Sequence, residues 1–226
     1  MSVTMGKKDE TEQVAQDEKE AEDKEEEQEE EKVEDMDPLH QLFYYCRRPD
    51  IEGIKKVSGG IQDINIRDDS ASKKDNGYKS LNTALHYAVL SGSLEAVRII
   101  YDLGANPDIQ NKLGSTPLHV AASLGYTEIT KFLLDKKANV EAVNNIHSTP
   151  LHCAVYAGHV ETVRAILEHC DDKRQSLMHP TNMVGFGPVK YTAHDDMKAY
   201  LKQFFPKKKG ANEQEQVGND VEEEEP

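Results

Sequence analysis

A six-residue motif that returns at constant spacing constrains this fold more than any other feature of the sequence. Residues 83–88 read T-A-L-H-Y-A, residues 116–121 read T-P-L-H-V-A, and residues 149–154 read T-P-L-H-C-A, so the period is 33 residues both times. A fixed period of this length is typical of stacked supersecondary units, because no such unit buries its apolar face alone. The sequence therefore predicts a solenoid.

The second copy of the motif shows how one unit should fold. Thr116 is a suitable N-cap, and Pro117 then takes the first helical position with its φ angle already set. Gly125 follows where a short helix needs a left-handed residue to end it. Residues 128–134 carry apolar side chains at helical spacing and predict a second helix. The chain then continues in an extended segment that turns near Asn144.

These residues resemble the ankyrin repeat, whose pattern G-x-T-P-L-H-x-A-A is followed by a glycine, a second helix and G-A-D. The resemblance is strong over residues 64–170 and weaker on the flanks. It implies an all-α solenoid with two antiparallel helices per repeat, finger loops between repeats and a concave binding face. We expect about five helix-pair units in a domain spanning residues 37–206. The clear repeats are expected at about 78–110, 111–143 and 144–176, and degenerate end repeats at about 37–68 and 181–206.

The repeated histidines are interpreted as structural. Adjacent units lie about a helix diameter apart, roughly 10 Å, which is too far for the histidines to share a zinc ion. The resemblance implies that each histidine hydrogen-bonds within its own repeat near the capping threonine. The residues assigned to this structural motif are Thr83, His86, Thr116, Pro117, His119, Thr149, Pro150 and His152. We expect no metal, cofactor or catalytic site, since no other pattern of ligands or nucleophiles is present.

The strong negative charge of the chain belongs to its two ends. Residues 9–37 hold 17 acidic and 3 basic side chains, whereas residues 38–206 hold 18 acidic and 19 basic ones. So many charges with so few apolar residues predict disordered tails at 1–36 and 207–226. The nearly neutral middle gives no electrostatic support for direct binding of nucleic acid.

The same sequence indicates an intracellular, soluble protein. The three cysteines form no regular pairs, which is typical of free thiols in a reducing compartment. No apolar run reaches the roughly 20 residues that a membrane span needs. The choice between cytoplasm and nucleus stays open, and we expect the protein to be monomeric by itself.

The resemblance implies that finger tips and the exposed side of each first helix contact a protein partner. The positions assigned to this contact are Leu90, Lys112, Leu113, Ser115, Leu124, Asn145, Ile146, Ser148 and Tyr156. Five of them are apolar or aromatic, which favours a non-catalytic protein–protein interaction module: an adaptor, scaffold or inhibitor.

An alternative function rests on the acidic N-terminal segment. In this alternative the protein is nuclear, its tail binds basic partners such as histones, and the repeat body serves only for docking. Residues 69–78 lengthen one finger and are either a second contact or a solvated loop.

Overall fold

The described part of the chain is a row of helix pairs in two layers. The computed structural model describes residues 33–70, 79–170 and 194–204 of the 226-residue chain, and regular secondary structure within these ranges is entirely helical. The first layer holds α2 (Pro38–Arg47), α4 (Ala84–Leu90), α6 (Pro117–Leu124) and α8 (Pro150–Ala157). The second layer holds α3 (Ile51–Ser58), α5 (Leu94–Asp102), α7 (Thr127–Asp135) and α9 (Val160–His169).

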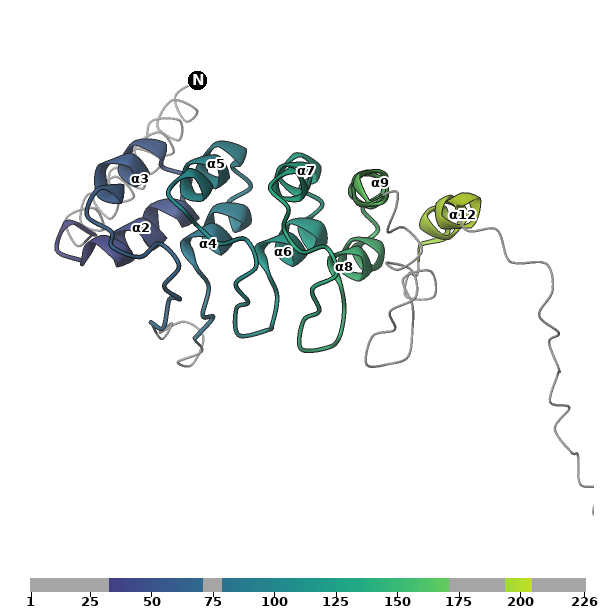
Figure 1. Ribbon diagram of the computed structural model, residues 1–226, viewed down its shortest axis with the longest axis horizontal. Helices are drawn as coiled ribbons and strands as arrows, with labels where there is room; N and C mark the ends of the chain where they lie inside the picture. The colour runs from purple at the N-terminus through teal and green to yellow at the C-terminus, as the bar shows by residue number, and fades with distance from the viewer. Residues whose placement is uncertain (1–32, 71–78, 171–193, 205–226) are drawn as a thin grey trace, which may run out of the picture.

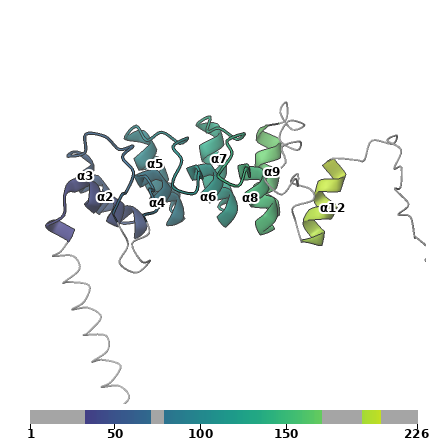
Figure 2. The same cartoon turned by 90° about the horizontal axis from the view of Figure 1, so that it is seen from below.

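The pairs follow one another along the stack in chain order. Finger loops project from the first layer, on the side away from α3, α5, α7 and α9 (Figure 1). A last helix, α12 (Asp195–Phe204), lies beyond α8 and α9 at the far end, as the view from below also shows (Figure 2). The predicted all-α solenoid is confirmed.

The helix starts and stops follow the predicted local chemistry. Thr116 is the N-cap of α6 in an extended conformation, and its backbone N–H donates to Nδ1 of His119 at 3.2 Å. Thr83 and Thr149 cap α4 and α8 in the same way, with the third residue of each helix, a histidine, as partner. Gly125 ends α6 with φ +72°, the left-handed conformation that favours glycine.

The core runs without interruption along the stack. Leu85, Leu118 and Leu151 occupy the same position of three successive repeats, and each is fully buried. Burial of a leucine side chain stabilises the fold by about 1.5–3 kcal/mol. Small residues such as Ala121 and Ala122 let the first helices approach their neighbours closely. The 33-residue period is therefore a period of core positions.

Each capping histidine also joins its repeat to the next one. Nε2 of His86 lies 2.9 Å from the carbonyl oxygen of Ser115, and Nε2 of His119 lies 2.9 Å from that of Ser148. Because Nδ1 accepts from the threonine N–H, Nε2 carries the proton and donates to the carbonyl. Burial lowers the pKa of His86 and of His119 to about 4, so both rings are neutral at physiological pH.

Helices with buried apolar residues lie at both ends of the described stack. Helices α2 and α3 lie at the N-terminal end, with Leu42 and Ile54 fully buried. At the other end Met197 and Leu201 of α12 are fully buried.

Residues 33–36, which the sequence assigned to the N-terminal tail, pack on the repeats: Val33 is 2% exposed, and Nζ of Lys56 donates to Oε1 of Glu34 at 3.1 Å. The rest of the predicted acidic tails, most of the inserted finger and the expected start of the last repeat near Gly187 lie outside the described residues, at 1–32, 71–78, 171–193 and 205–226.

Candidate functional site

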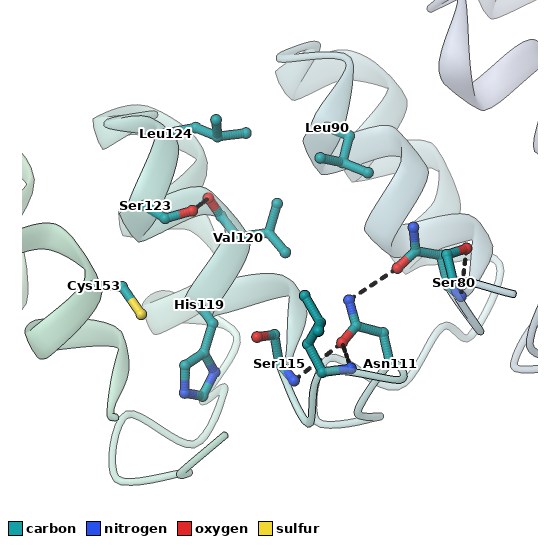
Figure 3. Close-up of a pocket in the computed structure, with 11 residues that line it drawn as sticks. Ser80, Leu90, Asn111, Ser115, His119, Val120, Ser123, Leu124 and Cys153 are labelled. Carbon is teal, nitrogen blue, oxygen red and sulfur yellow. Dashed lines mark hydrogen bonds between the residues drawn. The ribbon is translucent and has the colours of Figure 1, made fainter. Parts of the chain in front are cut away.

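A groove lies on the finger side of the first layer, between α4, α6 and the fingers beside them. Its volume is about 340 Å³. In Figure 3, Val120 and Leu124 of α6 face Leu90 of α4 across the space between the two helices. The residues that line this recessed groove are Ser80, Asn82, Leu90, Asn111, Leu113, Ser115, His119, Val120, Ser123, Leu124 and Cys153.

Three of the predicted apolar contact residues line this groove. Leu90 and Leu124 end α4 and α6 and are 43% and 41% exposed, and Leu113 at a finger tip is 60% exposed. The other two, Ile146 and Tyr156, lie in the following repeat and are 51% and 63% exposed. Ile146 follows Leu113 by one repeat period, so it belongs to the next finger. The exposed apolar residues thus lie on two fingers and three first helices.

Hydrogen bonds between neighbouring fingers fix the orientation of these tips. The N–H of Lys112 donates to the carbonyl of Ser80 at 3.0 Å, and the N–H of Asn145 donates to the carbonyl of Leu113 at 3.0 Å. The side-chain amide of Asn145 also donates to the carbonyl of Lys112 at 2.9 Å. Asn145 therefore links two fingers, and its exposed side chain is already engaged in part.

The expectation for Ser148 is wrong. Its side chain is 1% exposed, so it cannot contact a partner. The reason is local, because its carbonyl accepts from His119 and its N–H donates to Oδ1 of Asn144 at 2.9 Å, which turns the residue inward. Ser115 makes the corresponding bonds with His86 and Asn111, but it stays half-buried and reaches the groove wall.

A polar cluster that we did not predict lies at the N-terminal edge of the groove. Nη2 of Arg47 donates to Oδ2 of Asp68 at 2.9 Å and to the hydroxyl of Tyr87 at 2.6 Å. The same guanidinium lies 4.2 Å from the centre of the Tyr87 ring. The Tyr87 hydroxyl donates to Asp68 at 2.6 Å and lies 3.0 Å from the hydroxyl of Ser80, which lines the groove.

The carboxylate of this cluster is buried and fully engaged. Asp68 is 3% exposed, and its second oxygen accepts from the N–H and the hydroxyl of Ser70. Burial alone raises the pKa of Asp68, but hydrogen bonds from Ser70 and Tyr87 and the charge of Arg47 outweigh it and hold the pKa below its usual value. Asp68 is thus a fixed anion that anchors Arg47.

One residue of a nucleophilic type, Cys153, lines the groove. Burial raises the pKa of the Cys153 thiol to about 11, so the nucleophilic thiolate is scarce at neutral pH. Within residues 33–70, 79–170 and 194–204, no three His, Cys, Asp or Glu side chains are grouped as a metal site requires. Among the helices described, none combines the length and apolar character needed to cross a bilayer.

Comparison with known families decides the assignment. A family model of ankyrin repeats (three copies) matches residues 42–142 and 85–177. The chain belongs to the ankyrin-repeat family. Ankyrin repeats are in general protein–protein interaction modules and typically lack catalytic activity, so the groove is a candidate protein-binding surface. A search among curated proteins gives no match to this ankyrin-repeat chain.

Proposed function

We propose that this protein is a non-catalytic adaptor, scaffold or inhibitor that binds a protein partner through the recessed groove and the finger tips. The observation that carries the proposal is the set of exposed apolar side chains on three successive repeats. Its members are Leu90, Leu113, Leu124, Ile146 and Tyr156. Contiguous exposed apolar surface on a soluble protein usually marks a partner site.

The energetics favour the same role. Each of these side chains loses contact with water when a partner covers it, and full burial of such a side chain is worth about 1.5–3 kcal/mol. The finger hydrogen bonds hold Leu113 and Ile146 in place before binding, which lowers the entropy that association must overcome. Lys112 and Asn145 then supply exposed polar groups at the rim.

Affinity capture from native lysate tests this role with matched baits. One bait is the natural full chain, a second carries Leu113→Asp, Ile146→Asp and Tyr156→Asp together, and a matched pair carries Leu113→Asp or Leu103→Asp alone. Leu103 is also exposed, at 41%, but it follows α5 in the opposite layer. We expect partners to be lost with the groove variants and kept with Leu103→Asp. Partners that every bait retains would refute the proposal.

The charge of the N-terminal segment favours a second candidate, a nuclear protein whose acidic tail binds basic partners. The motivating observation is the excess of 17 acidic over 3 basic residues within 9–37. The test is a full chain in which the glutamates at 25–27 and 29–31 are glutamine. Partners lost with this variant, and weakened by salt, would favour the tail. Partners that remain would assign binding to the repeats.

A further inference from the structure

The finger side of the stack holds slightly more basic than acidic residues, although the whole chain carries a net charge of −15. The segments that form this side are 38–48, 64–70, 79–92, 107–125 and 140–158, and they contain five basic and four acidic residues. The basic residues are Arg47, Arg48, Arg67, Lys79 and Lys112, and the acidic ones are Asp68, Asp69, Asp108 and Glu141. By contrast, helices α3, α5, α7 and α9 together contain seven acidic and five basic residues.

Arg47 presents the strongest anion-binding group on this side. Its partner Asp68 is buried with both oxygens occupied, whereas 52% of the Arg47 side chain is exposed. Among the described residues, its hydrogen bonds all come from Nη2, so Nε and Nη1 can donate to an incoming carboxylate. The pair is neutral in sum, but only its positive half faces solvent.

This guanidinium lies next to the apolar groove. Arg47 donates to the Tyr87 hydroxyl at 2.6 Å, and that hydroxyl lies 3.0 Å from the hydroxyl of Ser80 in the groove wall. On the finger, exposed Lys112 immediately precedes Leu113. A ligand whose apolar side chain contacts Leu113 therefore lies near the Lys112 side chain on the finger and near Arg47 at the N-terminal edge.

We infer that the groove takes a partner segment in which a bulky apolar side chain is flanked by aspartate or glutamate. This inference rests on the proposed protein-binding function and specifies its partner. The apolar side chain enters among Leu90, Leu113 and Leu124, and the carboxylates pair with Arg47 and Lys112. Charge complementarity of this kind selects the partner and its orientation, because a basic segment would meet like charge on the rim.

The test is a random dodecapeptide library displayed on phage and selected on the immobilised full chain. The enriched sequences should combine Asp or Glu with Leu, Ile, Phe or another bulky apolar residue. A synthetic peptide of the most enriched sequence is then titrated against purified variants. We expect Leu113→Asp to weaken binding more than about tenfold. Arg47→Gln and Lys112→Gln should each weaken it about threefold to tenfold.

Control variants separate rim charge from charge in general. Lys131→Gln removes one positive charge on α7, where the ammonium pairs with Glu128 at 2.8 Å, and should leave the affinity unchanged. Lys112→Gln lies outside the Asp68 cluster, so it tests the rim even where Arg47→Gln disturbs folding. Raising the salt concentration from about 50 to about 500 mM should lower the affinity of the natural chain for the peptide.

The negative outcomes are distinct. Enriched peptides that are neutral or basic, yet need Leu113, would overturn this inference and leave the protein-binding function intact. Peptides that bind Leu113→Asp as well as the natural chain would overturn both. Peptide affinity that rises about tenfold when the glutamates at 25–27 and 29–31 become glutamine would assign the groove to the chain's own N-terminal segment and overturn an external partner.

Discussion

Nε2 of His119 donates to the carbonyl oxygen of Ser148 at 2.9 Å, across the boundary between two repeats. The same ring accepts at Nδ1 from the N–H of Thr116 at 3.2 Å. One buried side chain thus begins a helix and joins its repeat to the following one. Because neighbouring repeats provide the only long-range contacts in a solenoid, such links raise the cooperativity of folding.

Replacement of His119 by leucine should destabilise the protein by about 2–3 kcal/mol. The change leaves the N–H of Thr116 and the carbonyl of Ser148 buried without their partner, and an unsatisfied buried polar group costs about 1–3 kcal/mol. Urea unfolding followed by circular dichroism measures the loss. His147→Asn is the control, because His147 is exposed at a finger tip with φ +56°, a conformation that asparagine tolerates. Equal stability of the two variants would contradict the bridging role.

Stability should fall as the pH is lowered from about 6.5 towards 4. The pKa of both His86 and His119 is about 4 in the folded protein, against 6.5 for an ordinary histidine. Between these values the unfolded chain binds more protons than the folded one, so acid favours unfolding. Each histidine contributes roughly 3 kcal/mol to this loss. Urea unfolding at stepped pH is the measurement, and a double variant, His86→Gln with His119→Gln, should show a flatter profile. A free energy of unfolding of the natural chain that stays constant from pH 7 to 5 would contradict this prediction.

Replacement of Gly125 by alanine should destabilise the protein by about 1–3 kcal/mol. Gly125 has φ +72°, and a Cβ there would lie 2.6 Å from Nδ1 of His159. Thermal unfolding compares it with Gly59→Ala. Gly59 has φ −67° and no atom within 4 Å of the added Cβ, so alanine there should be neutral or stabilise by up to about 1 kcal/mol. A Gly125→Ala variant as stable as the natural chain would show that the backbone at this turn can relax.

Removal of the Tyr87 hydroxyl should raise the pKa of Asp68 and destabilise the protein by about 1–2 kcal/mol. The hydroxyl donates to Asp68 at 2.6 Å, and this bond favours the ionised carboxyl. Carbon-detected NMR of Tyr87→Phe during a pH titration measures the shift. Tyr101→Phe is the control, since no hydrogen bond of the Tyr101 hydroxyl occurs among the described residues and its ring packs on Phe132. An unchanged pKa of Asp68 would show that the Tyr87 hydroxyl is not needed to stabilise the ionised carboxyl group.

The sequence predicted the parts of the fold that depend on local chemistry and on periodicity. Thr116, Pro117 and Gly125 mark the ends of α6 because capping and left-handed turns depend on residue type alone. The apolar finger residues were assigned from the resemblance to ankyrin repeats, and Leu113 and Ile146 occupy equivalent positions one period apart.

Features that depend on contacts between units were not predictable in the same way. Ser148 was assigned to the surface, but the ring of His119 in the preceding repeat reaches its carbonyl and the residue turns inward. In the Arg47–Asp68–Tyr87 cluster, Arg47 bonds to residues that follow it by 21 and 40 positions, and no local sequence pattern predicts such contacts. One signal was available, because Tyr87 is a large polar aromatic where the following repeats have Val120 and Cys153.

Site-specific photocrosslinking tests the central claim, that the recessed groove is the working surface. The benzophenone amino acid p-benzoylphenylalanine replaces Leu113 in one full-length protein and Leu103 in another, so that equally bulky probes sit on opposite layers. Each protein is irradiated in native lysate, and its adducts are separated by mass. The account predicts discrete partner adducts from position 113 and none in common from position 103. The same adducts from both positions, or adducts from position 103 alone, would contradict it.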